Sequence, residues 1–192
     1  MLNGDQGNDV LIGGHYEGDD ADTLNGGEGD DRLEGSVGAD VLDGGNGFDT
    51  ASFSSAVTLD LLNPSASTGE AAGDVYVSIE RFSLSLGDDR FVGTDGGDVA
   101  HGSGGNDVLI GNGGDDDLNG GAGDDVVDGG AGNDTLRDAS GNNFVKGRSQ
   151  WSFWPSFFCG RASDIKRKTV GMRKNGRSFR RYAGRSPSRI GY

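Results

Sequence analysis

The sequence predicts an all-β solenoid, a stack of short strands, and two observations support this prediction. First, five blocks of nine residues follow one another from Gly93 to Arg137 without an insertion: GTDGGDVAH, GSGGNDVLI, GNGGDDDLN, GGAGDDVVD and GGAGNDTLR. Each block has glycine at positions one and four, aspartate at position six and an apolar residue at position eight. Such a short fixed period is typical of solenoids. Second, only 32% of the residues are hydrophobic and 38 of 192 are glycine, too poor a composition for a core of ordinary size.

The same nine-residue register covers most of residues 1–146. It fits one block from Gly4 to Ile12, four blocks from Glu17 to Ser52 and, more loosely, one block from Leu84 to Val92. Residues 138–146 are a decayed copy in which Asn143 replaces the aspartate, and residues 13–16 add four extra positions to the first array. We therefore expect two blocks of stacked repeats, over residues 1–52 and 84–146.

Each unit is expected to consist of a six-residue turn and a three-residue strand. Glycines at positions one, two and four permit positive φ and close backbone approach. Asn or Asp at position five, such as Asn8 and Asp30, is expected to favour the left-handed turn conformation rather than to bind a further ligand. Side chains alternate along a strand, so position eight points inward. The expected turn glycines include Gly96, Gly105, Gly114, Gly123 and Gly132, and the expected inward residues are Leu11, Leu24, Leu33, Leu42, Phe91, Ala100, Leu109, Leu118, Val127, Leu136 and Val145.

Residues 53–83 do not keep the nine-residue count. They contain two strand-like stretches, 57–62 and 75–79, separated by the turn-prone segment Asn63-Pro-Ser-Ala-Ser-Thr-Gly69. We expect a hairpin-like insertion or a distorted turn that splits the roll into two blocks.

Residues 147–192 differ sharply from the rest of the chain. They carry 12 basic and 1 acidic side chains, whereas residues 1–146 carry 5 basic and 30 acidic ones. Five aromatic residues lie between Trp151 and Phe158. We expect an irregular tail, and three interpretations stay open: an extension that contacts anionic surfaces such as headgroups or phosphates, a secretion signal, or sequence that is not native.

The aspartates at position six indicate a bound cation. One buried aliphatic side chain contributes about 1.5–3 kcal/mol, which cannot offset about 1–2 kcal/mol of backbone entropy for each of nine residues. Ca²⁺ takes six to eight oxygen ligands from carboxylates and carbonyls, and glycine-rich turns expose both. A solvated low-complexity linker is the alternative, but a bias in composition alone would not place an apolar residue two positions after each aspartate. The candidate metal ligands are Asp9, Asp22, Asp31, Asp40, Asp49, Asp89, Asp98, Asp107, Asp116, Asp125 and Asp134.

These blocks resemble the GGxGxDxUx repeats of the RTX (repeats-in-toxin, hemolysin-type) calcium-binding proteins. The resemblance implies a right-handed parallel β-roll in which each ion lies between turns two repeats apart, and about five to seven Ca²⁺ ions in all. The implied aspartate pairs are 9–31, 22–40, 31–49, 89–107, 98–116, 107–125 and 116–134, and Asp125 would meet the neutral Asn143 at a weaker site. It also implies a secreted, extracellular protein exported by a type I secretion apparatus.

We therefore expect calcium binding by repeats that fold outside the cell on binding the ion, as the C-terminal region of a secreted bacterial toxin or hydrolase. A calcium-stiffened segment of a cell-surface adhesin or structural protein is the alternative. Neither HExxH nor GxSxG occurs, so we expect no enzyme within these residues. We expect no nucleic acid partner for residues 1–146 and no transmembrane segment, since no stretch reaches about 18 apolar residues.

Overall fold

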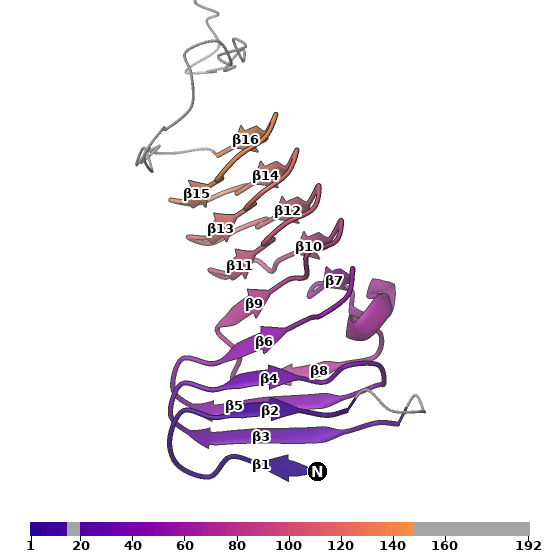
Figure 1. Cartoon of the computed structure of the whole chain (residues 1–192). Coiled ribbons are helices and arrows are strands. Elements are labelled where there is room, and N and C mark those ends of the chain that lie inside the picture. Colours follow the sequence, from indigo (N-terminus) through magenta and orange to yellow (C-terminus); the bar gives the residue numbers. More distant parts are fainter. Residues whose placement is uncertain (15–19, 148–192) are drawn as a thin grey trace, which may run out of the picture. The chain divides into compact units, whose positions relative to one another are not determined.

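The computed structural model describes residues 1–14 and 20–147, which form sixteen short strands and two 3-10 helices. The strands stack from β1 (Leu2–Asn3) at the bottom of Figure 1 to β16 (Phe144–Lys146) at the top. Every pairing between these strands is parallel. The predicted all-β parallel solenoid is therefore confirmed, and the described residues all fall within one compact unit.

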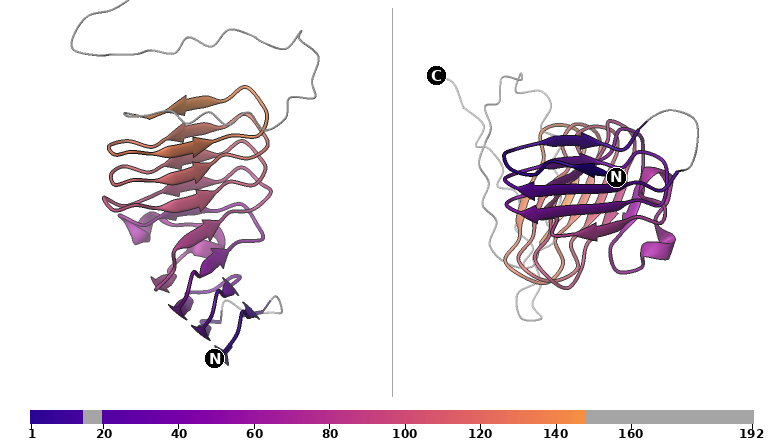
Figure 2. Two further views of the ribbon diagram at one scale, coloured as in Figure 1. Left: turned by 90° about the vertical axis from the view of Figure 1, so that its left-hand side faces the viewer. Right: turned by 90° about the horizontal axis from the view of Figure 1, so that it is seen from below.

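Three sheets make up the stack. In the upper part of Figure 1, one sheet lies on one side of the coils and a second lies opposite, and Figure 2 shows the rungs from the side and from below. The seven-stranded sheet contains β2 (Val10–Ile12), β4 (Arg32–Glu34), β6 (Thr50–Ser52), β9 (Arg81–Ser83), β11 (Val99–His101), β13 (Asp117–Asn119) and β15 (Thr135–Arg137). The four-stranded sheet contains β1, β3 (Thr23–Glu28), β5 (Val41–Asn46) and β8 (Val75–Val77). The five-stranded sheet contains β7 (Thr58–Asp60), β10 (Arg90–Val92), β12 (Val108–Ile110), β14 (Val126–Asp128) and β16.

Two nine-residue units make one coil. Leu109 lies beside Val127, and Leu118 lies beside Leu136, so partners in the sheets are two repeats apart. Leu11 lies beside Leu33, which is four residues further along than the regular spacing. The extra positions fall between β2 and β3 in the sequence, and the strands on either side keep their register.

The core is a narrow row of inward-pointing side chains, as the alternation along each strand predicts. Eight of the eleven expected inward residues are buried, and Leu11, Leu136 and Val145 pack against the same cluster. Ala51, at position eight of the block Gly44–Ser52, belongs to the same cluster, and Leu59 and Phe82 extend it through the part of the chain that lost the nine-residue count.

The segment 53–83 continues the stack and does not form the hairpin that we expected. β7 pairs with β10, and β8 pairs with β5, both in parallel, so the two predicted strands lie in different sheets. The 3-10 helices η1 (Pro64–Ala66) and η2 (Gly69–Ala71) connect them. The physical reason is burial, because stacking on the coils places Leu59 in the core and Tyr76 against it.

Aromatic side chains fill the core where the four-stranded sheet gives way to the five-stranded one. Tyr76 contacts Phe53 and Phe82 edge-on, with ring centroids 6.4 Å and 5.3 Å apart. Phe82 in turn lies 5.8 Å from Phe91. These large side chains fill space that a single leucine per repeat does not.

The tail at 148–192 lies outside the described residues, so its three interpretations stay open. Within residues 1–14 and 20–147, no helix is long and apolar enough to cross a membrane.

Candidate metal centre

The acidic residues before the strands form two columns, one along each side of the stack. The first ladder precedes the strands of the seven-stranded sheet and consists of Asp9, Asp31, Asp49, Glu80, Asp98, Asp116 and Asp134. The second ladder lies on the other side and consists of Asp22, Asp40 and Asp74, then Asp89, Asp107, Asp125 and Asn143. All eleven predicted ligands lie in these ladders. Val57 precedes β7, so the second ladder is interrupted there.

The structure brings together every pair that the resemblance implied. In each pair the backbone N–H of one residue donates to the side-chain Oδ1 of its partner one coil further along the chain. Asp107, for example, accepts from the Asp89 N–H at 2.9 Å and donates its own N–H to Asp125 at 2.9 Å. The same bond joins residues 9–31, 22–40, 31–49, 98–116, 116–134 and 125–143.

The second carboxylate oxygen of most ladder aspartates is buried without a hydrogen-bond donor. Asp40 and Asp49 are 0% exposed, and Asp107 and Asp125 are 1% exposed. An unpartnered buried acceptor costs about 1–3 kcal/mol, and more when it is charged. A bound cation would remove this cost. The oxygens concerned are Oδ2 of Asp9, Asp31, Asp40, Asp49, Asp107, Asp116, Asp125 and Asp134.

Burial disfavours the charged form of these carboxyl groups. It raises the pKa of Asp107 to about 7, and the charges of Asp89 and Asp125 on either side add to the shift. Burial likewise raises the pKa of Asp116 to about 6, and it raises the pKa of Asp40 and Asp49. Closely spaced carboxylates of this kind are stabilised by a divalent cation or by protons.

The glycine at position one is required because other groups approach it closely, as expected, but these glycines lack the positive φ that was also expected. At Gly102, an added Cβ would overlap Asp107 Oδ2 and the carbonyl oxygen of Gly120. For each glycine at position one, Oδ2 of the aspartate that follows lies less than 3.0 Å from where an added Cβ would be. None of these glycines has positive φ. A carbonyl oxygen and a carboxylate oxygen facing one space are the ligands that Ca²⁺ prefers. This combination recurs at Gly4, Gly13, Gly26, Gly93, Gly102 and Gly111.

The glycines at position four do require the left-handed conformation. Gly105 has φ 106°, and an added Cβ would overlap the carbonyl of Gly87 in the previous coil. Gly114, Gly123 and Gly132 also have positive φ, as predicted. Gly96 does not, because its turn is closed differently, by the Gly96 N–H donating to Thr94 Oγ1 at 3.0 Å.

Asp89 and Asp98, the first ladder members after the segment 53–83, differ from the other aspartates. Asp89 Oδ2 accepts from the N–H and the hydroxyl of Ser85, each at 2.9 Å. Asp98 Oδ2 accepts from the same two groups of Thr94, at 2.6 and 3.1 Å. Position two holds Ser or Thr in these turns, so protein donors occupy the oxygen that is unpartnered elsewhere.

The residues at position five are not left-handed, which corrects a second expectation. Their side chains form an exposed ladder that runs opposite to the aspartate ladders: the N–H of Asp30 donates to Asn8, and the N–H of Asp124 donates to Asn106, each at 2.9 Å. Within the nonapeptide repeats, the left-handed residues other than glycine lie at position two instead, and they are Asp5, Ser36, Ser103 and Asn112. A hydrogen bond between coils thus determines the residue type at position five.

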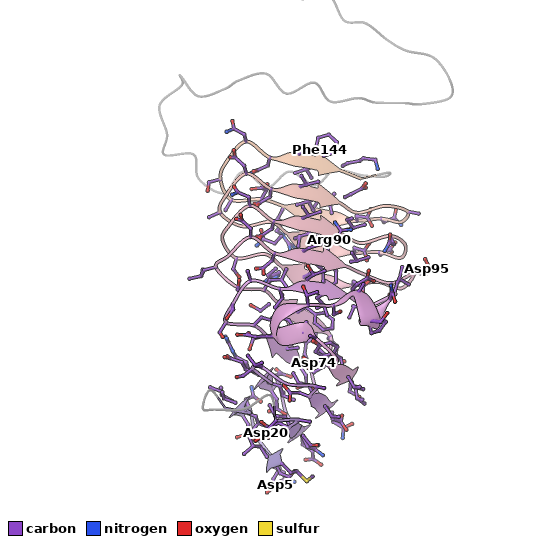
Figure 3. The ribbon with its side chains drawn as sticks, turned by 90° about the vertical axis from the view of Figure 1, so that its right-hand side faces the viewer. Asp5, Asp20, Asp74, Arg90, Asp95 and Phe144 are labelled. Atoms are coloured by element: carbon purple, nitrogen blue, oxygen red, sulfur yellow. The ribbon has the colours of Figure 1, made fainter. Side chains whose placement is uncertain are left out.

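Two ladder members, Asp74 and Glu80, were not predicted from the sequence. Figure 3 shows Asp74 in the middle of the stack, between Asp5 and Phe144. Its signal is present in the sequence, because GEAAGDVYV from Gly69 to Val77 has glycine first, aspartate sixth and an aromatic residue eighth. Glu80 follows Asp74 by only six residues and has no such signal.

Side chains alone do not complete a metal site here. Among residues 1–14 and 20–147, no three acidic, histidine or cysteine side chains converge on one point. Each candidate site between two aspartates has two carboxylates from adjacent coils, and the remaining ligands would be turn carbonyl oxygens.

The repeats match a known family. The family model described as "RTX calcium-binding nonapeptide repeat (4 copies)" matches residues 1–15, 16–51, 85–118, 92–127, 110–145 and 128–150. These matches cover more than half of the chain and leave out the segment that lost the nine-residue count. A comparison with curated proteins found no match. The chain belongs to the family of RTX calcium-binding nonapeptide repeat proteins.

Proposed function

We propose that this chain binds several calcium ions between successive turns of its two ladders, and that binding stabilises the folded stack. RTX repeats bind calcium, and the observation that supports this role here is the row of buried, unpartnered carboxylate oxygens. Paired carboxylates and the carbonyl oxygens of the turn glycines would hold each ion. When bound, calcium supplies a positive charge that neutralises these carboxylates.

The charge balance supports coupling between binding and folding. Residues 1–146 carry 30 acidic and only 5 basic side chains, and the ladders bring many of the acidic groups together. Without a cation, their repulsion favours an expanded chain. Because the paired sites exist only in the folded stack, the free energy of binding contributes directly to folding.

The ladder geometry distinguishes strong from weak candidate sites. The strongest are those in which both aspartates have an unpartnered oxygen: 9–31, 31–49, 107–125 and 116–134. Sites 89–107 and 98–116 are weaker because Ser85 and Thr94 donate to one carboxylate of each. Site 125–143 is weaker because Asn143 is neutral. This ranking is compatible with about five to seven ions.

For cellular context, we propose that the chain is part of a secreted bacterial toxin or hydrolase and folds outside the cell. Extracellular calcium-binding modules have dissociation constants of about 10⁻⁴–10⁻³ M, which suits a stack that folds after export. The high negative charge also suits export of an expanded chain by a type I apparatus. We further propose that these residues carry no active site, because their acidic pairs recur along the stack instead of forming one centre.

The second candidate, a calcium-stiffened segment of a cell-surface adhesin, uses the same ladders. The parent reading frame distinguishes the two candidates. Many further repeats would favour the adhesin, and an upstream hydrolase or toxin domain would favour the secreted protein.

Equilibrium dialysis of the full chain against calcium tests the binding proposal, with magnesium as the control. We expect several calcium ions to bind per chain, cooperatively and at sub-millimolar to millimolar concentrations, with little magnesium bound. Binding of fewer than one calcium ion per chain at 10 mM (about ten times the weakest dissociation constant expected) would refute the proposal.

A further inference from the structure

The first ladder continues through the segment that has no nonapeptide motif. Glu80 occupies the place before β9 that aspartate occupies before the other strands of this sheet. Its Oε2 accepts the backbone N–H of Asp49 at 2.8 Å, as the ladder aspartates do for one another. The N–H groups of Glu80 and Arg81 both donate to the Asp49 carbonyl, at 3.1 and 3.0 Å, so the backbone is fixed at this point.

Asp49 presents a free carboxylate oxygen at this junction. It is 0% exposed, and its Oδ2 has no hydrogen-bond partner. An added Cβ on Gly44 would overlap both Asp49 Oδ2 and the carbonyl oxygen of Ser78. The regular repeats have the same arrangement, in which Gly26 faces Asp31 Oδ2 and the carbonyl of Gly44. Ser78 thus takes the place that a repeat glycine has elsewhere.

Asp74, the other acidic residue that sequence analysis missed, lacks this free oxygen. Its Oδ1 accepts the Asp40 N–H at 2.9 Å, and its Oδ2 accepts the hydroxyl of Tyr76 at 2.9 Å. The first part of the second ladder therefore ends at Asp74 with both carboxylate oxygens occupied.

The charge of Glu80 is not neutralised by its neighbour. Glu80 is exposed, and it forms no ion pair with another described residue. The guanidinium of Arg81 instead lies over the ring of Phe48, 4.6 Å from its centroid. The Glu80 carboxylate is therefore available to a cation that approaches from solvent.

We propose that Asp49, Glu80 and the carbonyl oxygen of Ser78 form a further calcium site that lies outside the nonapeptide motif. It joins the segment 53–83 to the first array of repeats, so that calcium stabilises this junction as it does the regular coils. The proposal rests on the proposed calcium binding and adds a site that the repeats do not encode.

Equilibrium dialysis against calcium tests this site in the full chain with Glu80→Gln, and Glu28→Gln is the matched control. The Gln carbonyl can still accept the Asp49 N–H, so Glu80→Gln should fold at high calcium while losing the charged ligand. We expect one ion fewer per chain, or one site weakened by at least about tenfold. Glu28 is exposed and lies outside both ladders, so Glu28→Gln should bind as the unaltered chain does.

The outcomes separate this inference from the proposed function. If the unaltered chain binds no calcium, the proposed function fails. If the unaltered chain binds calcium and Glu80→Gln binds the same number of ions with the same affinity, only the Asp49–Glu80 site is refuted. If Glu80→Gln loses all its ions, Glu80→Asp decides, because it keeps the charge and is the residue type that the regular coils have at this place. Recovery of the ions in Glu80→Asp supports the site, whereas a Glu80→Asp chain that also binds none overturns it, because the charge at this position would then not be what holds the ion.

Discussion

Replacing Asp116 by alanine should cost the chain more calcium-dependent stability than replacing Asp134. Asp116 lies between two partners, since it accepts the N–H of Asp98 at 2.9 Å and donates its own N–H to Asp134 at 3.3 Å. Asp134 has one partner within the described residues. If each ion lies between paired aspartates, Asp116→Ala damages two sites and Asp134→Ala damages one.

The magnitude of the difference follows from linkage. Each site contributes about 2.7 kcal/mol of folding free energy when calcium is at about 100 times its Kd. Each variant also leaves one backbone N–H without its acceptor, at a cost of about 1–3 kcal/mol that is common to both. Asp116 and Asp134 are similarly buried, at 2% and 7% exposure, so the desolvation terms nearly cancel. The two variants differ by the 98–116 site, which is one of the weaker sites, so the difference should be at most about 2.7 kcal/mol, or at most about 5–11 °C in Tm for a unit of this size.

Thermal unfolding followed by circular dichroism measures this difference at saturating calcium, and the same scans with a chelator serve as the control. The two variants should differ with calcium and agree without it. Equal Tm values at saturating calcium would refute the assignment of shared sites along the ladder.

Three further predictions concern the pH dependence of folding, the space beside the turn glycines and the stability of the segment 53–83. Because burial raises the pKa of Asp107 to about 7 and of Asp116 to about 6, the folded chain holds protons more tightly than the unfolded chain. This stabilisation is complete below about pH 4 and lost as pH rises through 6–7. The calcium-free chain should thus gain β signal in circular dichroism from pH 8 to pH 5, and a loss of signal would contradict this assignment. Gly102→Ala should raise the calcium midpoint of folding and destabilise by about 1–3 kcal/mol, because its Cβ would overlap Asp107 and the Gly120 carbonyl. In Gly104→Ala the Cβ would meet only ordinary contacts at 3.6 Å or more, so an equal effect of the two substitutions would argue against the packing account. Glu70 is 6% exposed; burial alone would raise its pKa, but hydrogen bonds from Ser54 and Ser55 outweigh burial and lower it. Glu70→Ala should therefore destabilise the chain by about 1–3 kcal/mol in urea unfolding at saturating calcium, with the number of bound ions unchanged; a lower ion count would place Glu70 at a calcium site instead.

The sequence predicted the stack because position and structure correspond one to one within a regular repeat. Leu109 and Leu118 lie inward because position eight always does, and Asp107 meets Asp125 because two repeats make one coil. The four extra residues near Gly13 did not disturb this register, since β2 still pairs with β4 and β3 with β5.

Features that depend on contacts between coils could not be predicted in this way. Glu80 joins the first ladder only because the chain returns from β8 to β9 after a short turn, and no spacing in the sequence records that path. The left-handed role expected of Asn8 was wrong because its side chain bonds the next coil, which local propensity does not describe. Asp74 had a detectable repeat signal, which the irregular sequence around it obscured.

Far-UV circular dichroism of the full chain during a calcium titration tests the central claim most directly, with magnesium as the control. The buried, unpartnered carboxylates predict a cooperative gain of β signal at sub-millimolar to millimolar calcium and none with magnesium. A β signal that is already complete without calcium at pH 8, or that never develops, would contradict a stack whose folding depends on the ion.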